Sequence, residues 1–276
     1  MQRAKQRGKR IIMKHIVSWS GGKDSTATII LAHMLGLPID LIVMCVLWFD
    51  KKRGITGENP EHIAWVYNYA KPLFESWGYK VEIISSEKDY MHYFYKVRQK
   101  SKYPEYVGKY YGWVLGGKCK MQGEKEQPIK HYLKSLGKPG VDYIEYVGIC
   151  ADEKDRIETL MKKKGKRSLL AENNYTQPDA KRLCADYGLL SPTYGIAKRG
   201  GCWYCPNQGI PELARLKQQH PELWNELVEL SQVENTITRG FKYGQTFESV
   251  NAEVDTYIEN QKYAAMQMTI WDAMEE

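Results

Sequence analysis

The hydrophobic positions of the chain form short strand-like runs that alternate with longer helical stretches. Residues 41–49 are apolar without interruption, which is typical of a strand buried on both faces of a parallel sheet. The helical pattern of residues 23–35 ends at Gly36 and Pro38, which favour a helix stop. The whole pattern predicts strands at 15–19, 41–49, 80–84 and 143–149, and helices at 23–35, 61–77, 88–100, 126–136, 178–187 and 211–230, the last with a break at Pro221.

Strands that alternate with helices predict an α/β fold, with a parallel sheet covered by helices on both faces. We expect this domain to occupy residues 14–170, after a basic arm at residues 1–13. Residues 171–276 are expected to form a smaller helical region that carries cysteines. The last 40 or so residues have moderate helical character and no clear motif.

The turn between the first predicted strand and the first helix has an unusual composition. Glycines at such a turn let the backbone approach a ligand closely, and the helix that follows adds the positive end of its dipole. Bound pyrophosphate would gain the charge of Lys23 and hydroxyl donors, and Asp24 could help to position Mg²⁺. A tight turn with a helix cap explains the glycines and one serine, but not the lysine and aspartate together. The six residues are Ser20, Gly21, Gly22, Lys23, Asp24 and Ser25.

The chain has six cysteines, at positions 45, 119, 150, 184, 202 and 205. Cys202 and Cys205 form a CxxC motif in GGCWYCPN, a spacing that lets two thiolates bind one metal ion. Cys119 and Cys184 complete a candidate set of four ligands, which as soft thiolates would select Zn²⁺ or an iron–sulfur cluster. The alternative is a redox pair or a chance spacing at the CxxC motif. The other two cysteines lie in or at the end of predicted strands and are expected to be small core residues.

The net charge is +7, and residues 154–167 carry seven of the lysines and arginines. Such a surface could bind nucleic acid, although a solvated helix face followed by a lysine-rich loop explains it equally well. No apolar run reaches the ~20 residues that a membrane-spanning helix needs. The N-terminal residues are basic and lack the apolar stretch of a secretory signal. We therefore expect a cytoplasmic protein that does not cross a membrane.

The motif SGGKDS after a first strand resembles the PP-loop of the ATP pyrophosphatase superfamily, whose members cleave ATP between the α and β phosphates. Four further stretches, in this order, resemble the phosphoadenosine phosphosulfate (PAPS) reductase-like family: CKMQGEKEQPIKHYLK, YVGICADEKDR, LCADYGLLSP and GGCWYCPN. The resemblance covers roughly residues 14–225. It implies a Rossmann-like fold of the adenine nucleotide alpha hydrolase type, with MgATP at residues 20–25.

The same resemblance implies roles for residues outside the loop. Asp152, Glu153 and Arg156 would lie at the carboxyl edge of the sheet, where open α/β folds bind ligands. Arg156 suits a phosphate or sulfate group and joins Lys23 and Asp24 as a candidate catalytic residue. Asp50, at the end of the second strand, is expected near the nucleotide together with Asp152 and Glu153.

The chain departs from true PAPS reductases in one respect, because the 71 residues after Cys205 contain no further cysteine. The sulfonate-accepting thiol of those enzymes therefore has no counterpart here. The remaining features resemble family members that transfer sulfur, such as DNA phosphorothioation sulfurtransferases and PP-loop tRNA thiolases, some of which hold a [4Fe–4S] cluster. We expect an ATP-dependent sulfurtransferase, with two alternatives: reduction of an adenylyl sulfate, or a nucleotide-binding accessory subunit without turnover.

Overall fold

The computed structural model describes residues 13–114, 119–195 and 201–275, with the side chains of 269–275 left aside. Its contacts divide the chain into two compact units. Unit 1 comprises Met1–Val46, Glu61–Ser86 and Lys125–Tyr194, and unit 2 comprises Leu47–Pro60, Glu87–Glu124 and Gly195–Glu276, within the described residues. The contacts keep residues 171–194 in unit 1, and they join the internal segments 47–60 and 87–124 to the part of the chain after residue 195. The domain boundary near residue 170 stays a prediction.

Unit 1 contains a five-stranded parallel sheet with the strand order β5-β2-β1-β7-β8. The α/β fold class expected from the sequence is therefore confirmed. From β1 the chain first adds strands on one side and later on the other, and ligands of open α/β sheets bind at such a reversal. The strands are β1 (Lys14–Trp19), β2 (Leu41–Val46), β5 (Val81–Ser85), β7 (Tyr143–Tyr146) and β8 (Lys166–Arg167).

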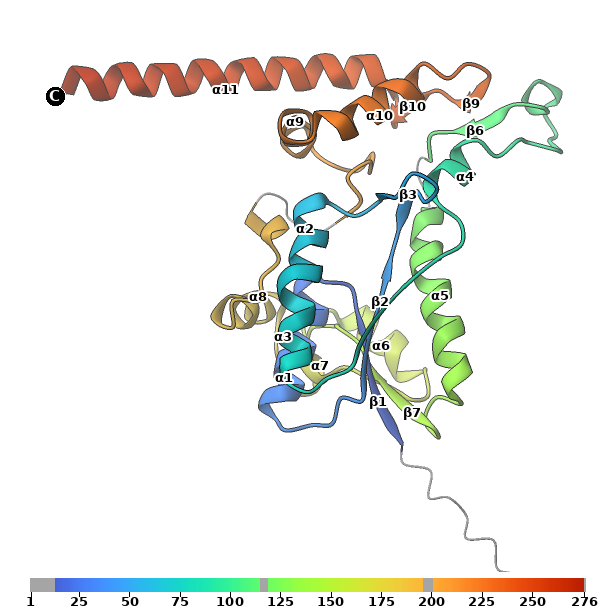
Figure 1. The fold of residues 1–276 in the computed structure, drawn as a ribbon, viewed down its shortest axis with the longest axis vertical. Coiled ribbons are helices and arrows are strands. Elements are labelled where there is room, and N and C mark those ends of the chain that lie inside the picture. Colours follow the sequence, from blue (N-terminus) through green and yellow to red (C-terminus); the bar gives the residue numbers. More distant parts are fainter. Residues whose placement is uncertain (1–12, 115–118, 196–200, 276) are drawn as a thin grey trace, which may run out of the picture. The chain divides into compact units, whose positions relative to one another are not determined.

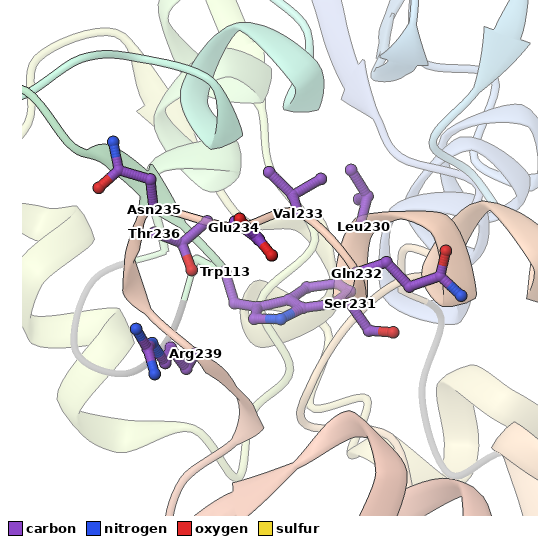
Figure 2. Close-up of a pocket in the computed structure, with 9 residues that line it drawn as sticks. All are labelled: Trp113, Leu230, Ser231, Gln232, Val233, Glu234, Asn235, Thr236 and Arg239. Atoms are coloured by element: carbon purple, nitrogen blue, oxygen red, sulfur yellow. The ribbon is translucent and has the colours of Figure 1, made fainter.

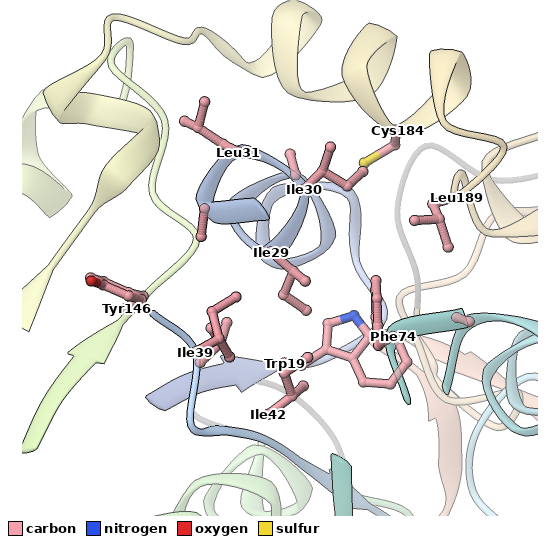
Figure 3. Close-up of a cluster of buried hydrophobic side chains, with 14 of the residues drawn as sticks. Trp19, Ile29, Ile30, Leu31, Ile39, Ile42, Phe74, Tyr146, Cys184 and Leu189 are labelled. Atoms are coloured by element: carbon pink, nitrogen blue, oxygen red, sulfur yellow. The ribbon is translucent and has the colours of Figure 1, made fainter. Parts of the chain in front are cut away.

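Both faces of this sheet are covered (Figure 1). Side chains alternate along each strand, so Val17 joins the larger core cluster on the α1 face while Ile16 packs with Leu133 of α5 on the other face. Figure 3 shows the larger cluster, in which Trp19 and Phe74 meet edge to face. The helices are α1 (Lys23–Met34), α2 (Pro60–Trp65), α3 (Lys71–Ser76), α5 (Lys120–Leu136), α6 (Lys154–Met161), α7 (Leu169–Glu172) and α8 (Gln177–Asp186).

Three of the predicted helices differ from the observed elements. The helix expected at 126–136 begins earlier, at Lys120. The helix expected at 61–77 is present, but a π-helical segment, Val66–Ala70, joins α2 to α3. The helix expected at 88–100 was wrong beyond its first turns, because α4 spans only Tyr90–Phe94. Val97 instead forms an antiparallel bridge with Tyr110, which draws the chain into an extended conformation.

Unit 2 combines short strand pairs with three helices of the described C-terminal part. Aromatic side chains dominate its core, including the fully buried Phe49, Trp203 and Phe241. The predicted break at Pro221 is confirmed, because it separates α9 (Ile210–Gln219) from α10 (Pro221–Ser231). The other elements are β3 (Trp48–Asp50), β4 (Ile55–Thr56), a 3-10 turn (Pro104–Tyr106), β6 (Tyr110–Gly112), β9 (Thr236–Thr238), β10 (Gly240–Lys242), β11 (Gln245–Thr246) and α11 (Phe247–Glu275), with a further 3-10 turn at Pro192–Gly195 on the boundary of the units.

Among the helices that the structure describes, none has both the length and the apolar character that crossing a membrane requires.

Candidate functional site

The loop that follows β1 depends on a glycine in the left-handed region. Gly21 has a φ of +71°, and a Cβ atom there would lie 2.3 Å from Cε1 of His62. His62 is buried, and its ring nitrogens lie 2.8 Å from Oγ of Ser191 and 3.3 Å from the carbonyl oxygen of Ser20. The imidazole thus packs directly on the loop backbone and links it to the segment around Ser191.

A second glycine holds the loop from the side of β7. A Cβ atom on Gly148 would lie 2.5 Å from the backbone nitrogen of Ser25 and 2.6 Å from the carbonyl carbon of Asp24. The Ser25 hydroxyl in turn accepts a hydrogen bond from the Ser20 nitrogen at 3.2 Å and donates one to the Gly22 carbonyl at 3.1 Å. Close backbone approach and an internal hydrogen-bond ring therefore fix the conformation of the turn.

The charged residues of the loop form an ion pair at the start of α1. The Lys23 Nζ lies 2.6 Å from Oδ1 of Asp24 and 3.2 Å from Oε1 of Gln177. Burial on its own lowers the pKa of Lys23, but the hydrogen bond and charge of Asp24 outweigh it, so that the pKa rises above its ordinary value. Lys23 is therefore a fixed positive charge at the loop.

The first backbone nitrogen of α1 donates to a side chain. Gly22 is the N-cap and provides no side-chain acceptor for these donors. The Tyr194 hydroxyl accepts a hydrogen bond from the Lys23 nitrogen at 2.9 Å. The Tyr194 hydroxyl thus lies at the N-terminus of α1, which is a favourable place for an anion.

Glu153 and Arg156 follow β7 and lie near the loop. The Glu153 carboxylate accepts hydrogen bonds from the Cys150 nitrogen at 2.9 Å and from Arg156 at 2.5 Å. Ligand atoms of Asp24, Cys150 and Glu153 lie within 4.8 Å of one another. The structure therefore brings two of the predicted carboxylates together with a thiol that the sequence did not single out.

The remaining two predicted nucleotide-binding carboxylates are placed differently. Asp152 accepts a hydrogen bond from the nitrogen of Gln177, whose side chain contacts Lys23, so it belongs to the same region of unit 1. Asp50 belongs to unit 2, where its carboxylate accepts a hydrogen bond from the Arg53 nitrogen at 3.1 Å. Within its own unit Asp50 thus stabilises the turn between β3 and β4.

The CxxC motif forms a tight turn that is anchored by its two central residues. The Cys205 nitrogen donates to the Cys202 carbonyl at 3.1 Å. Trp203 and Tyr204 are buried, and the Trp203 indole donates to the Thr56 carbonyl at 2.7 Å. Because the aromatic side chains point into the core, the flanking cysteines remain half-buried at the surface of unit 2.

Tyr90 lies close to three of the predicted metal ligands. Burial raises the pKa of its phenol, and the charges of the Cys119, Cys202 and Cys205 thiolates raise it further. Among the described residues, the group whose ligand atoms lie within 4.8 Å of one another is Asp24, Cys150 and Glu153, and the three thiols do not form such a group. Cys119 is exposed, and Cys202 and Cys205 are half-buried.

The fourth predicted ligand, Cys184, has a different environment from these three. It lies on α8 in unit 1, where Figure 3 shows it in the larger core cluster. Its thiol is fully buried and donates to the Lys23 carbonyl at 3.2 Å. Burial raises the pKa of Cys184 to about 12, so the thiol keeps its proton at neutral pH. In unit 1 Cys184 therefore packs under the loop, and its membership of the four-thiolate set stays a prediction.

Cys150 is the second thiol next to the loop. It is fully buried and donates to Oδ1 of Asp24 at 3.2 Å. Burial raises its pKa strongly, and the Asp24 carboxylate adds to that effect. The core position expected for Cys150 and for Cys45, which is buried in β2, agrees with their exposure.

Unit 2 also contains a cavity of about 530 Å³ beside the segment 230–236 (Figure 2). Trp113 and Arg239 complete its wall. None of the site residues predicted from the sequence lines this cavity, which belongs to unit 2, whereas the loop belongs to unit 1.

Three residues that organise the loop were not predicted in this role, namely His62, Gly148 and Tyr194. Each comes from a segment distant in sequence from the loop, so local spacing holds no signal for its contact. Only the glycine of YVGIC, at a predicted strand end, could have suggested a close backbone approach.

No protein-family model matches the chain, and no curated protein matches it. Membership of the PAPS reductase-like family therefore stays a prediction from the motifs.

Proposed function

We propose that the protein binds MgATP at residues 20–25, cleaves it between the α and β phosphates, and so activates an acceptor for sulfur transfer. The observation that carries this proposal is the position of Lys23. Its protonated side chain and the first backbone donors of α1 lie together at a glycine turn that follows the first strand of a parallel sheet. This is the combination of charge, dipole and close backbone approach that a pyrophosphate group requires.

In the proposed reaction an acceptor oxygen attacks the α phosphorus, and the bond between that phosphorus and the bridging oxygen to the β phosphate breaks. Pyrophosphate leaves with the electron pair of that bond. Lys23 would exchange Asp24 for the phosphate oxygens and stabilise the developing negative charge. The backbone donors of the loop would do the same once the Tyr194 hydroxyl leaves the Lys23 nitrogen, and Gly21 and Gly148 hold the turn in place. A sulfur nucleophile would then displace AMP from the activated acceptor.

The carboxylates of Asp24 and Glu153 are suitable ligands for Mg²⁺, which prefers oxygen donors. The ion would neutralise charge on the phosphates when bound. The thiol of Cys150 is not a ligand that Mg²⁺ prefers, and the hydrogen bond of this thiol orients Asp24 instead.

Cys119, Cys202 and Cys205 would hold the second predicted cofactor, Zn²⁺ or a [4Fe–4S] cluster. The CxxC turn supports this for two of them, because the Cys205 nitrogen donates to the Cys202 carbonyl at 3.1 Å and so holds both thiols on one turn. Three thiolate ligands leave a coordination position open, which is the arrangement of reactive rather than structural metal sites. Such a metal would bind and polarise the sulfur that is to be transferred.

The decisive experiment is a product analysis with purified protein, MgATP and a panel of RNA, DNA and mononucleotide acceptors. AMP and pyrophosphate as products support the proposal, whereas ADP and phosphate would exclude cleavage at the α–β bond. Sulfite release from adenylyl sulfate or PAPS would instead support the reductase alternative. Nucleotide binding without any of these products would support the accessory-subunit alternative.

A further inference from the structure

The cavity of unit 2 in Figure 2 contains none of the residues proposed above for MgATP or for a metal. Its wall is formed by the end of α10, the segment 232–236, Trp113 and Arg239. Its volume of about 530 Å³ lies within the range of small-molecule sites, about 300–1,000 Å³. A ligand of this cavity would therefore be a second small molecule, held by residues of unit 2 alone.

Two buried side chains in the wall carry hydrogen-bond donors that are not used. Trp113 is 5% exposed and Thr236 is 8% exposed. Within residues 13–114, 119–195 and 201–275, neither the Trp113 indole N–H nor the Thr236 hydroxyl forms a hydrogen bond. Buried donors are nearly always paired in folded proteins, because an unpaired donor loses its bonds to water without compensation. These two donors therefore indicate a ligand with acceptor atoms in the cavity.

A positive charge lies on the same wall as these donors. Arg239 is exposed, and its guanidinium has no ion pair or hydrogen bond with a residue that the structure describes. A guanidinium presents its N–H groups in a fork that matches a carboxylate. Figure 2 shows the Trp113 indole between Arg239 and the end of α10. The donors at this part of the cavity together suit a carboxylate group.

The end of α10 favours the opposite charge. The last turn of this helix contains no basic residue, so no side chain of the helix compensates the negative end of its dipole. Glu234 follows the helix in the wall of the cavity, and its carboxylate has no ion pair or hydrogen bond in the described part of the chain. Glu234 and Arg239 thus do not pair with each other, and both charges are available to a ligand. An ammonium group is stabilised at this part of the cavity.

The remaining part of the wall is apolar. Leu230 is buried, and Val233 is half-buried against the same aromatic core that contains Trp113. Figure 2 shows Leu230 and Val233 on the other side of the Trp113 indole from Arg239. A ligand gains free energy by burying apolar surface there, whereas a charged group would lose its hydration.

We propose that this cavity binds a free α-amino acid with an apolar side chain. The carboxylate of the amino acid lies at Arg239 and the two buried donors, and its ammonium lies at Glu234 and the end of α10. The side chain of the amino acid packs against Leu230. This binding does not require the proposed ATP chemistry, because none of these residues belongs to the loop in unit 1.

The test is a calorimetric titration of the full-length protein at pH 7 with each of the twenty common amino acids. We expect at least one apolar amino acid to bind with a Kd of about 1 mM or tighter, and those with charged side chains to bind more weakly. The N-acetyl derivative and the amide of the best ligand remove its ammonium and its carboxylate charge one at a time. Each of the two compounds should bind at least about tenfold more weakly than the amino acid.

Two variants assign each charge of the ligand to a side chain. Arg239→Gln and Glu234→Gln alter exposed residues, and each should weaken binding of the amino acid by about tenfold or more. N-acetylation of the ligand should cause little further loss in Glu234→Gln, and amidation little further loss in Arg239→Gln. The controls Glu248→Gln and Lys52→Gln remove exposed charges of unit 2 outside the cavity and should leave the affinity unchanged.

Each contrary outcome overturns the inference. Absence of binding for every amino acid at about 10 mM, or equal affinity in the cavity variants and their controls, would exclude the site. Equal binding of the N-acetyl derivative would show a site for a simple anion, and equal binding of the amide would show a site for a simple cation. The same titration with Lys23→Ala should give unchanged affinity, so failure of the proposed ATP chemistry and failure of this inference are distinguishable.

Discussion

The cysteines near the loop and those near the CxxC turn differ in their burial and in their hydrogen bonds. Cys150 and Cys184 in unit 1 are fully buried, donate to oxygen acceptors of the loop, and have raised pKa values because of burial. Cys119 in unit 2 is exposed, while Cys202 and Cys205 are half-buried on a turn held by its aromatic residues. The first pair keeps its protons and packs the loop, whereas the second group is accessible for metal binding. Residue type alone therefore does not identify a metal ligand in this chain.

The difference between the groups has its largest expected effect on metal content. Because thiolate ligands are needed to hold the ion, Cys202→Ser should lose essentially all bound zinc or iron. Cys184→Ser should keep it, since this buried thiol is not among the ligands expected from the structure. Metal analysis after anaerobic purification measures both. Loss of metal in both variants would restore the four-thiolate set and contradict the distinction between the two groups.

On the loop side, Lys23→Ala should reduce pyrophosphate release by about a hundredfold to a thousandfold, as the loss of one preorganised donor to a developing charge does. The ion pair with Asp24 is lost as well, but the fold should remain because glycines and serines hold the turn. The matched control is Lys52→Ala at an exposed lysine of unit 2. Undiminished turnover in Lys23→Ala would remove the loop from the mechanism.

Substituting a glycine by alanine adds one methyl group and tests whether the loop tolerates it. Gly148→Ala places a Cβ atom 2.5 Å from backbone of α1, so we expect a loss of stability of about 1–3 kcal/mol and weaker ATP binding. Gly123→Ala is the control, because its Cβ atom would meet nothing within 4 Å and alanine is favoured in a helix such as α5. Urea unfolding curves compare the two variants. Equal midpoints would mean that the close approach of β7 and α1 is not a constraint.

The sequence predicted the part of this arrangement that depends on local pattern. The apolar run at 41–49 correctly indicated a buried strand, but that strand ends at Val46, and Trp48–Asp50 form β3 in an antiparallel pair with β4. SGGKDS was correctly placed after the first strand, with the first helix beginning at Lys23. The contacts that shape the loop come from His62, Gly148 and Tyr194, which only the fold brings together. The environment of Cys184 also depends on packing, since α8 lies on α1 through contacts that helical periodicity does not encode.

The pH dependence of the free energy of unfolding tests the raised pKa of the buried Cys184 thiol. The pKa of Cys184 is raised to about 12 in the folded protein, compared with an ordinary value of 9.0, so the unfolded chain loses this proton first as pH rises. The contribution of the neutral Cys184 thiol to the free energy of unfolding is therefore at its maximum below pH 9. It declines above pH 9 by about 1.4 kcal/mol for each pH unit. Cys184→Ala should flatten the decline between pH 9 and 10, measured by urea unfolding of metal-free protein. Cys119→Ala, at an exposed thiol, is the control. Equal slopes in wild type and Cys184→Ala would show that Cys184 titrates normally.

The smallest expected effect concerns the hydroxyl that occupies the start of α1. ATP can reach the Lys23 nitrogen only if the Tyr194 hydroxyl gives up its 2.9 Å hydrogen bond. Tyr194→Phe removes this competitor and should tighten ATP binding by severalfold, which corresponds to the ~1 kcal/mol of one neutral hydrogen bond. Tyr187→Phe, at an exposed tyrosine of the same unit, should change nothing. Weaker ATP binding by Tyr194→Phe would mean that the hydroxyl contacts the nucleotide rather than competing with it. In that case the phosphates would not replace the Tyr194 hydroxyl, and its hydrogen bond with the Lys23 nitrogen would persist when ATP is bound.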